Sequence, residues 1–361
     1  MFESTYKGRK TFITGHTGFK GSWLSLWMDL LGARLTGYSL PPPTDPNHYD
    51  LINLRIESFI GDINNREMLS DALRQTKPSI VFHLAAQPSV LYSYTNPLET
   101  FRTNILGTAN LLEICRQIES IRAIIIITTD KCYKNKEWEW GYRENDELGG
   151  DDPYSSSKAC VELIVSSYRK SYFPLEEYGA SHRILLSTAR AGNVIGGGDW
   201  TEDRLVPDVM RSAAKGQKVI IRNKDHIRPW QHLLDPICGY LLLGKQLIEG
   251  RKEFSGPWNF GPDDADSIDV LSVVKELSNS WSELSYKFDN SNEKQRETKM
   301  LKLDASKAKS RLGWKPVWKG KEVFSKTVEW YQAYYTSKES LSKDQLKKYI
   351  QDANESYDYV R

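Results

Sequence analysis

The chain has 361 residues, of which 39% are hydrophobic and 27% are charged, and its formal net charge is +2. This composition excludes disorder over most of the chain and gives no general attraction to nucleic acid or to a membrane surface, so an anionic ligand must be bound by local Arg or Lys side chains. The length predicts one large domain or two medium-sized ones with an ample core.

Cysteine usage and hydropathy bear on the compartment. Cys115, Cys132, Cys160 and Cys238 form no CxxC pair and no metal-binding spacing, which predicts structural thiols in a reducing cytosol and no metal site. No apolar run approaches the roughly 20 residues of a membrane-spanning helix, and no leader-type apolar segment precedes the first predicted strand. We therefore expect a soluble, cytoplasmic protein.

Strands and helices alternate along the first half of the chain. Runs that are apolar on both faces predict strands of a parallel sheet, and helical periodicity predicts the segments between them. The predicted strands are 11–14, 34–38, 80–83, 123–128 and 183–189. The predicted helices are 21–31, 65–75, 98–117 and 154–170. This alternation predicts an α/β fold with a Rossmann-like doubly wound parallel sheet, whose ligands bind at the carboxyl ends of the strands.

The pattern changes in the second half of the chain. Beyond residue 192 it loosens into Gly- and Pro-rich loops and short elements, which predicts a smaller lobe that covers the substrate. We expect a dinucleotide-binding domain over 1–190 and a nucleotide-sugar-binding lobe over 191–340, partly interleaved with the first domain. Residues 341–361, rich in Lys, Asp and Tyr, predict a surface helix and a tail.

Residues 14–21, Thr-Gly-His-Thr-Gly-Phe-Lys-Gly, follow the first strand directly. Glycines let the backbone turn tightly and approach a pyrophosphate, whose charge the next helix N-terminus stabilises. A merely structural loop is the alternative, but the position after the opening strand favours a nucleotide site. The GxxGxxG spacing resembles the extended branch of the short-chain dehydrogenase/reductase family. This resemblance implies a dinucleotide held by Gly15, Thr17, Gly18, Phe19, Lys20 and Gly21.

The end of the second predicted strand bears on the choice between NAD and NADP. An NAD enzyme usually offers an acidic residue to the adenosine ribose at this point, whereas this chain has Tyr38, Ser39, Leu40 and then three prolines. His16 and Lys20 could meet the 2′-phosphate of NADP, or they could be solvated surface. We expect NAD and leave NADP open.

Two further turns resemble cofactor contacts of the same family. Asp62 and Ile63 follow a further strand expected between 34–38 and 80–83, where extended members place an Asp against the adenine amine; a helix-capping role is the alternative for Asp62. Leu84, Ala85 and Ala86 follow strand 80–83. They resemble the family's cofactor-lining turn, in which small side chains permit close contact with the dinucleotide.

Tyr154 and Lys158 lie four residues apart on a predicted helix and therefore share a face. A phenol has an ordinary pKa of about 10 and becomes a useful base only if a cation stabilises the phenolate. Such pairs occur by chance in many helices, but here Thr129 ends the preceding strand. The resemblance implies that Tyr154 deprotonates a sugar hydroxyl, that Thr129 hydrogen-bonds it and that Lys158 also holds the nicotinamide ribose.

Asp130 and Lys131 follow Thr129 directly and add a second acid/base pair. An elimination needs one group to protonate a leaving hydroxyl and another to remove a carbon-bound proton. A lysine serves as the base only if burial or a nearby cation lowers its pKa. Thr-Asp-Lys-Cys-Tyr resembles the CDP-glucose 4,6-dehydratase branch of the family, whereas larger dehydratase groups carry Asp and Glu. The alternative is a structural salt bridge at the strand end.

Four longer stretches, 15–23, 191–200, 203–208 and 227–236, resemble the same branch, and the resemblance extends to about residue 316. Asn193 can bond a diphosphate or sugar oxygen, and Arg204 and Arg228 can clamp a pyrophosphate. Gln87 is assigned to the substrate by the resemblance. Trp side chains in these stretches can pack on the base or the sugar. Surface arginines and core tryptophans are the alternatives, and no motif reads cytosine by itself.

The resemblance implies conversion of CDP-glucose to CDP-4-keto-6-deoxyglucose and water, a step toward deoxysugars of bacterial surface polysaccharide, including lipopolysaccharide O-antigen. Tyr154 would remove the C4 hydroxyl proton while hydride leaves C4. Lys131 would take the C5 proton as Asp130 protonates the leaving C6 hydroxyl, and the hydride would return to C6.

Two other classes of protein share this pattern in part. A nucleotide-sugar epimerase or reductase would have the same fold and Tyr/Lys pair but would leave Asp130 and Lys131 unexplained. A non-enzymatic dinucleotide sensor would have no need to keep Tyr154, Lys158 and Thr129 together. The family implies a homodimer through the helices that start near Leu98 and Tyr154, or a tetramer built from two dimers.

Overall fold

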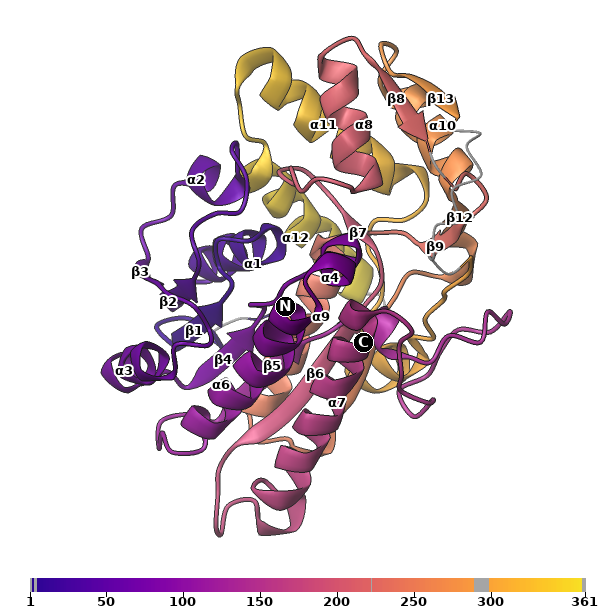
Figure 1. Ribbon diagram of the computed structural model, residues 1–361. Helices are drawn as coiled ribbons and strands as arrows, with labels where there is room; N and C mark the ends of the chain where they lie inside the picture. Colours follow the sequence, from indigo (N-terminus) through magenta and orange to yellow (C-terminus); the bar gives the residue numbers. More distant parts are fainter. Residues whose placement is uncertain (1, 3–4, 222, 289–298, 359–361) are drawn as a thin grey trace.

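Seven parallel strands form the central sheet of the protein, in the order β11-β6-β5-β4-β1-β2-β3 (Figure 1). The computed structural model describes residues 2, 5–221, 223–288 and 299–358. The strands of this sheet are β1 (Lys10–Thr14), β2 (Arg34–Ser39), β3 (Glu57–Ile60), β4 (Ile80–His83), β5 (Ala123–Ile127), β6 (Leu185–Ala191) and β11 (Pro257–Phe260). The strand order reverses between β1 and β4, which confirms the prediction of a doubly wound sheet.

The predicted strands agree closely with the structure because they are buried on both faces. β4 has the predicted bounds, and β1, β2 and β5 differ by one residue at one end. All five residues of β5 are buried, as expected of a central strand in a parallel sheet. β6 begins and ends two residues later than predicted.

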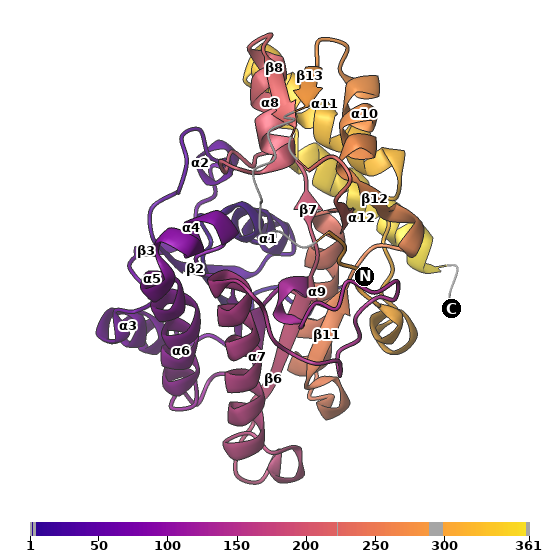
Figure 2. The same ribbon diagram turned by 45° about the vertical axis from the view of Figure 1, so that its right-hand side comes forward.

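Helical layers cover both faces of the sheet (Figures 1 and 2). One core cluster joins α1 (Phe19–Leu30) and α9 (Leu234–Ile248) to residues of alternate sheet positions such as Ile13 and Ile125. The other joins α3 (Arg66–Thr76), α6 (Gly107–Cys115) and α7 (Pro153–Ser171) to Phe12 and Ile124. Because successive strand residues point to opposite faces, the two clusters alternate along each strand.

The predicted helix 98–117 contains an irregularity that its sequence pattern does not reveal. The structure has α5 (Pro97–Phe101), a π-helical turn at Arg102–Leu106 and then α6. Asn104 lies in the wide turn, accepts a hydrogen bond from the Gln87 amide at 2.8 Å and donates to the Ser157 hydroxyl at 2.8 Å. The π turn therefore links the loop after β4 to α7, a typical use of this feature near functional sites.

The second half of the chain is more regular than predicted. α9 and α11 (Lys321–Ser337) have 15 and 17 residues, so the expectation of only short elements was wrong. α9 contacts β5 and β6, and β11 extends the main sheet beside β6. The domain boundary expected near residue 190 stays a prediction. After crossing the lobe, the chain returns to the main sheet at β11, as the expected interleaving of the two parts implies.

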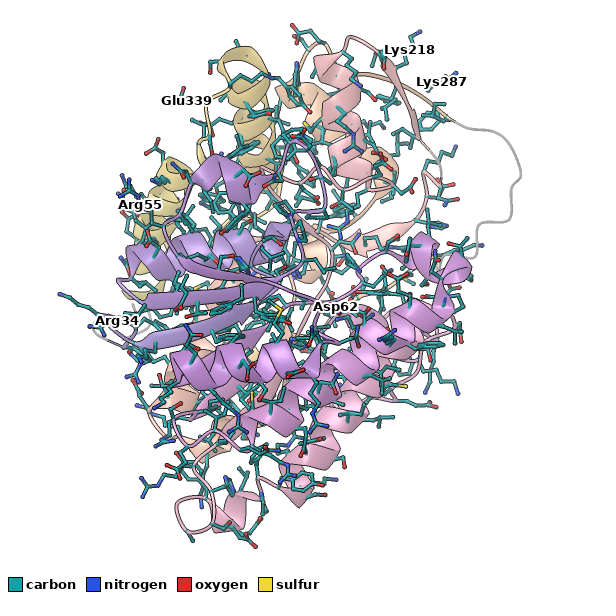
Figure 3. All side chains as sticks on the ribbon, turned by 60° about the vertical axis from the view of Figure 1, so that its left-hand side comes forward. Arg34, Arg55, Asp62, Lys218, Lys287 and Glu339 are labelled. Carbon is teal, nitrogen blue, oxygen red and sulfur yellow. The ribbon has the colours of Figure 1, made fainter. Side chains whose placement is uncertain are left out.

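The remaining elements build the lobe and the surface around the sheet. The short strands pair as β7 (Val194–Ile195) with β10 (Gln231–His232), β8 (Lys218–Ile221) with β13 (Ser285–Phe288), and β9 (Ile227–Pro229) with β12 (Ser267–Asp269). The other helices are α2 (His48–Ile52), α4 (Val90–Thr95), α8 (Leu205–Ala214), α10 (Val270–Ser280) and α12 (Ser342–Asp358). Figure 3 shows Lys218 and Lys287 close together at the outer end of this lobe.

The helix expected near the C-terminus is α12, but it is more than a surface element. Leu346, Tyr349 and Ala353 on one of its faces are fully buried, and the Tyr349 ring packs edge-on against Trp27 of α1. The predicted tail, 359–361, lies outside the described residues. Nowhere in the described ranges is a helix both long and apolar enough to cross a bilayer.

Candidate active site

A cavity of about 830 Å³ lies at the carboxyl ends of the strands, between the sheet and the lobe. Its walls include every site residue predicted from the sequence except Gln87. In Figure 3, Arg34 at the start of β2 lies at one end of the strands, and Asp62, which follows β3 and lines the cavity, lies toward their carboxyl ends. The sequence motifs therefore converge on one site, at the place that the doubly wound topology predicts.

The glycine turn after β1 is closely packed. Gly15 has a φ of +73°, and a Cβ built on it would lie 2.7 Å from the Ala85 amide nitrogen. A Cβ on Gly21 would lie 2.0 Å from the Gly15 carbonyl oxygen. Gly18 precedes α1 and provides no side-chain cap for the first turn. The first amides of α1 thus have no side-chain cap, and the glycine turn beside them has no room for a side chain at Gly15 or Gly21. A pyrophosphate site at a helix N-terminus requires both features.

A buried hydrogen-bond chain fixes the neighbouring turn after β4. The Thr14 hydroxyl lies 2.7 Å from His83 Nδ1 and accepts from the amides of Leu84 and Ala85 at 3.2 Å each. This chain holds residues 84–86 against Gly15. Burial, and to a smaller extent the charge of Lys158, lower the pKa of His83 to about 3, so the imidazole is neutral near pH 7 and acts as a structural link.

The Asp62 side chain lines the cavity beyond β3. Its Oδ1 accepts from the Asn64 amide at 2.8 Å and from Asn64 Nδ2 at 3.0 Å. α3 is capped instead by Asn65, which accepts from the Met68 amide, so the helix-capping alternative for Asp62 was wrong. Ile63 is 4% exposed and also lines the cavity.

His16 and Lys20 lie apart from the position where a 2′-phosphate would bind. His16 is fully buried, its Nε2 lies 2.8 Å from the Ser58 hydroxyl, and burial lowers its pKa to about 4. Lys20 extends toward the other end of the cavity, where Arg204 and Asp130 act on its charge; burial first, and then Arg204, lower its pKa to about 8. Neither side chain is a phosphate ligand at the end of β2.

Tyr154 and Lys158 enter the cavity from the start of α7. Asp152 caps this helix by accepting from the Ser155 amide at 2.9 Å, which fixes the first turn. Burial raises the pKa of Tyr154 above its ordinary value, while Thr129 and Arg204 act to lower it. Burial lowers the pKa of Lys158 to about 8, and the charge of Glu162 opposes this shift. Both groups are therefore held in a dry, polar site.

Asp130 and Lys131 form a short 3₁₀ turn directly after β5 and also line the cavity. The Thr129 hydroxyl donates to Asp130 Oδ1 at 2.9 Å. The other carboxylate oxygen of Asp130 is buried and has no hydrogen-bond partner among the described residues. No ion pair joins Asp130 to Lys131 in the described part of the chain, so the salt-bridge alternative receives no support.

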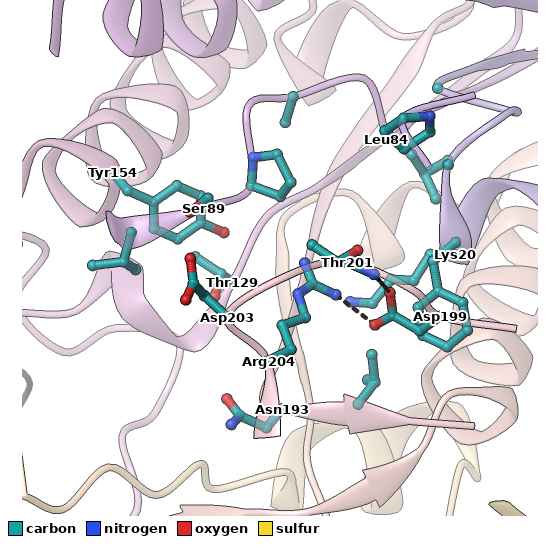
Figure 4. A pocket seen from close by; sticks show the side chains of 18 of the residues that line it. Lys20, Leu84, Ser89, Thr129, Tyr154, Asn193, Asp199, Thr201, Asp203 and Arg204 are labelled. Carbon is teal, nitrogen blue, oxygen red and sulfur yellow. Dashed lines mark hydrogen bonds and ion pairs between the residues drawn. The ribbon is translucent and has the colours of Figure 1, made fainter. Parts of the chain in front are cut away.

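Asn193, Arg204 and Arg228 bring polar groups to the lobe side of the cavity. Arg204 Nη1 donates to Asp199 at 3.0 Å (Figure 4). Arg228 is 5% exposed, and its Nη1 donates to the carbonyl oxygens of Ile227 and Lys299 at 2.9 and 3.2 Å.

The predicted substrate ligand Gln87 differs from the others because its side chain is occupied nearby. Its Nε2 donates to the Thr100 hydroxyl at 2.8 Å and to the Ser89 carbonyl at 3.1 Å, so its role toward a substrate stays a prediction. Among the tryptophans of the motif stretches, Trp23 and Trp200 are core residues at 0% and 5% exposure, and Trp230 lines the cavity.

Some residues of the site were given no role by the sequence motifs. Asp199, Thr201 and Asp203 line the cavity beside Arg204 (Figure 4). Asp203 has a φ of +60°, an uncommon backbone region for a non-glycine residue. For Asp199 the sequence offers a hint, because it follows the glycine run 196–198 directly and precedes Arg204 by five residues.

A buried ion pair joins α7 to β6 one helical turn beyond Lys158. Glu162, one turn after Lys158, accepts from the hydroxyl groups of Thr128 and Thr188 at 2.5 and 2.8 Å and from Arg190 Nη2 at 2.8 Å. Burial acts to raise the pKa of Glu162, but Arg190 and the two hydroxyls hold it below its ordinary value. These bonds join α7 to the ends of β5 and β6, beside Thr129.

The protein has a doubly wound parallel sheet with a glycine turn after β1. Thr129 follows β5, and Tyr154 and Lys158 lie in the first turns of α7, all three on the same cavity. These features define the class of the protein, an extended short-chain dehydrogenase/reductase. The model of the GDP-mannose 4,6-dehydratase family matches residues 12–327, and the chain belongs to this family.

Similar proteins agree with this assignment. The chain is 47% identical over 350 residues to a CDP-glucose 4,6-dehydratase of Salmonella typhimurium, which covers 96% of this chain and 97% of the relative. Among solved structures, an epimerase from Methanothermobacter thermautotrophicus superposes with a TM-score of 0.81 at 20% identity and covers 93% and 96% of the two chains. A dTDP-glucose 4,6-dehydratase from Bacillus anthracis in complex with NAD gives 0.73 at 20% identity, with 90% and 96% covered.

Proposed function

We propose that the protein is a CDP-glucose 4,6-dehydratase that converts CDP-glucose to CDP-4-keto-6-deoxyglucose and water. The observation that carries the proposal is the presence of two acid/base pairs in one cavity, Asp130 with Lys131 and Tyr154 with Lys158. The 47% identity with the Salmonella dehydratase over nearly the whole of both chains supports the same substrate.

NAD is the proposed cofactor, because the glycine turn brings backbone without side chains to the N-terminus of α1, where a pyrophosphate binds well. We propose that the predicted residues of the turns after β1, β3 and β4 hold it. The neutral, buried His16 and the distant Lys20 leave no basic ligand from this turn for a 2′-phosphate, which favours NAD over NADP. When bound, NAD supplies a two-electron oxidant for an alcohol carbon.

Tyr154, Thr129 and Lys158 are proposed to carry the oxidation at C4. The Tyr154 phenol receives the proton of the C4 hydroxyl, and Thr129 hydrogen-bonds the same hydroxyl. Burial opposes formation of a phenolate, whereas Thr129 and Arg204 favour it. Lys158 contributes a cation four residues along the same helix face and binds the nicotinamide ribose. Two hydrogens leave C4 and its hydroxyl, which makes the C5 proton acidic.

Asp130 and Lys131 are proposed to carry the elimination. Lys131 accepts the C5 proton, and Asp130 donates a proton to the C6 hydroxyl, which leaves as water. The unpartnered, buried Oδ2 of Asp130 is available for this proton. The two hydrogens taken from C4 and its hydroxyl are balanced by one hydrogen gained at C6 and one proton at C5, so the net change is loss of one water.

The nucleotide part of the substrate is proposed to bind on the lobe side. Arg204 and Arg228 offer guanidinium groups to the diphosphate, and Asn193 offers an amide to a phosphate or sugar oxygen. An epimerase or reductase would use the same Tyr154 and Lys158 but would give no role to the second pair, and a sensor would need neither pair.

The assembly is proposed to be a homodimer, or a tetramer of two dimers, formed through α5, α6 and α7. Leu98 of α5, Leu106 of the π turn before α6 and Leu163 of α7 are 81%, 57% and 58% exposed, a concentration of apolar surface that suits an interface. Leu163→Glu should lower the molecular mass measured by light scattering; an unchanged mass would contradict this interface. The four free thiols are consistent with the proposed cytoplasmic location. A place in O-antigen synthesis is proposed from the resemblance alone.

Mass spectrometry tests the reaction directly. We expect the purified protein, incubated with CDP-glucose and NAD in heavy water, to form a product that has lost one water and gained one deuterium at C5. Asp130→Asn and Lys131→Ala should slow elimination more than oxidation, so that reduced cofactor accumulates in a single turnover. An unchanged substrate would contradict the proposal and lead next to dTDP-, GDP- and UDP-sugars. Single-turnover spectra unchanged in both variants would contradict the assigned roles.

A further inference from the structure

Arg204 lies at the junction of the two halves of the cavity. It precedes α8, and its side chain is 36% exposed while that of Asp199 is 6% exposed. Figure 4 shows the guanidinium between the side that carries Tyr154 and Thr129 and the side that carries Lys20. The charge of Arg204 acts on the pKa values of both Tyr154 and Lys20, so its exact placement matters to the whole site.

Asp199 is the residue that fixes this placement. Arg204 Nη1 donates to Asp199 Oδ2 at 3.0 Å, and this is the hydrogen bond that Arg204 makes through its side chain among the described residues. One N–H of the guanidinium is used, and the other donors of this cavity-lining residue make no hydrogen bond to a described residue. An arginine has five such donors in a rigid fork, so a single anchored bond sets the direction of the rest.

Asp199 is itself rigidly held. Its Oδ1 accepts from the Thr201 amide at 3.0 Å, and its own amide donates to the Tyr331 hydroxyl at 3.0 Å. Tyr331 is fully buried on α11, and a Cβ on Gly197 would lie 2.0 Å from the Trp330 ring. The turn that carries Asp199 is therefore packed against α11, and the carboxylate has little freedom to move.

The surrounding charges make this anchor necessary. The charges of Arg204 and Lys158 both act to lower the pKa of Lys20, and the charge of Asp130 opposes them. Like charges in a partly buried site repel, so a free guanidinium would turn toward solvent. Asp199 supplies the opposite charge that keeps the guanidinium inside the cavity.

We propose that Asp199 is a positioning residue that holds Arg204 ready for the diphosphate of the nucleotide sugar. The inference rests on the proposed function. An arginine fixed in its binding geometry loses less conformational freedom when an anion binds, so the anchor strengthens diphosphate binding. Asp199 itself contacts no reacting atom, and its effect should appear in affinity for the diphosphate and little in the chemical step.

A double-mutant cycle tests the proposal with CDP and cytidine as probes. In Asp199→Asn the amide oxygen can still accept from the Thr201 amide, while the NH₂ group faces the Arg204 guanidinium and cannot bond to it. We expect calorimetry to show CDP binding weakened about tenfold and cytidine binding changed less than about twofold. In the Arg204→Met background, Asp199→Asn should have no further effect on CDP.

Several outcomes would overturn the proposal. They are an equal loss for CDP and cytidine, an unchanged loss in the Arg204→Met background, and tighter CDP binding in Asp199→Asn, which would mean that Asp199 competes with the ligand. Asp199→Glu keeps the charge but displaces it by one methylene, so it should also weaken CDP even if the Asn variant does not fold. Turnover of CDP-glucose by the unmodified protein tests the proposed function separately.

Discussion

The two helical layers that cover the sheet each bury a carboxylate, and the two groups have very different surroundings. Glu162 of α7 is 4% exposed and faces Thr128, Thr188 and Arg190, so its pKa is held below its ordinary value. Asp235 of α9, on the other face, is fully buried, and burial raises its pKa to about 7.

The difference follows from the donors that each carboxylate meets. Asp235 Oδ1 accepts from the Val317 amide and the Tyr349 hydroxyl, both at 2.7 Å, but its Oδ2 has no partner among the described residues. Among the described residues no salt bridge joins a cation to Asp235 as Arg190 is joined to Glu162, although the more distant charge of Lys319 acts to lower the pKa of Asp235. In the α7 layer the buried carboxylate is therefore paired with a buried cation beside the site. In the α9 layer the buried carboxyl has no salt bridge, and one of its oxygens has no hydrogen bond among the described residues.

The largest effect is expected from Tyr154→Phe in the α7 layer. The ring still fills its place in the core, but the group that receives the C4 proton is lost, and kcat should fall by about 10²–10⁴-fold, as for loss of a general base. Thermal unfolding should change little. Tyr168→Phe on the same helix is the control and should keep kcat within about twofold. Full turnover by Tyr154→Phe would remove Tyr154 from the mechanism.

Glu162→Gln tests whether fixed charge is what distinguishes the α7 layer. The amide cannot neutralise Arg190, which is 2% exposed, and an uncompensated buried charge costs about 3–5 kcal/mol of unfolding free energy. Urea unfolding at pH 7 measures this loss. Glu113→Gln is the matched control because its ion pair with Arg116 is partly exposed, and it should cost less than about 1 kcal/mol. Equal losses would contradict the comparison.

Gly21→Ala tests the turn at the start of the other layer. A Cβ at 2.0 Å from the Gly15 carbonyl forces the backbone apart, and we expect a loss of about 1–3 kcal/mol in unfolding free energy together with weaker NAD binding. Gly18→Ala lies in the same turn, but its Cβ would meet the Gly15 carbonyl at 3.4 Å, so it should cost less. A larger loss in Gly18→Ala would show that the close approach at Gly21 is not limiting.

The strands and the dinucleotide turn could be predicted because their signals are local. A run such as 123–128 is apolar on both faces, which indicates a central parallel strand, and the glycine spacing directly follows β1. Tyr154, Lys158 and Asp130 were found for the same reason, since each lies at the end of a recognisable strand or at the start of a helix. Their roles in the reaction stay predictions.

The features that escaped prediction depend on distant contacts. α9 is buried nearly all round, so its apolar run lacks the alternation of a surface helix. The bond between Asp199 and Tyr331 joins residues 132 positions apart, and no sequence pattern marks it. The π turn at Arg102–Leu106 is likewise set by the contacts of Asn104, which the helical pattern does not contain.

Asp235→Asn should give the smallest effect, visible mainly as a change in pH dependence. A carboxyl whose pKa is raised from about 3.9 to about 7 binds its proton more tightly in the folded state, so it costs nothing well below pH 4 and destabilises the fold increasingly up to about pH 7. The Asn variant lacks this penalty. Its stability relative to the unmodified protein should therefore be higher at pH 8 than at pH 5 by about 2–3 kcal/mol, because each pKa unit titrated in this range is worth about 1.4 kcal/mol. The unpaired NH₂ of the Asn side chain lowers stability equally at both pH values and leaves this difference unchanged. Thermal unfolding at both pH values measures the difference, with the exposed Asp71→Asn as control. A difference that does not change with pH would mean that Asp235 is ionised throughout, and that the two helical layers handle buried charge alike.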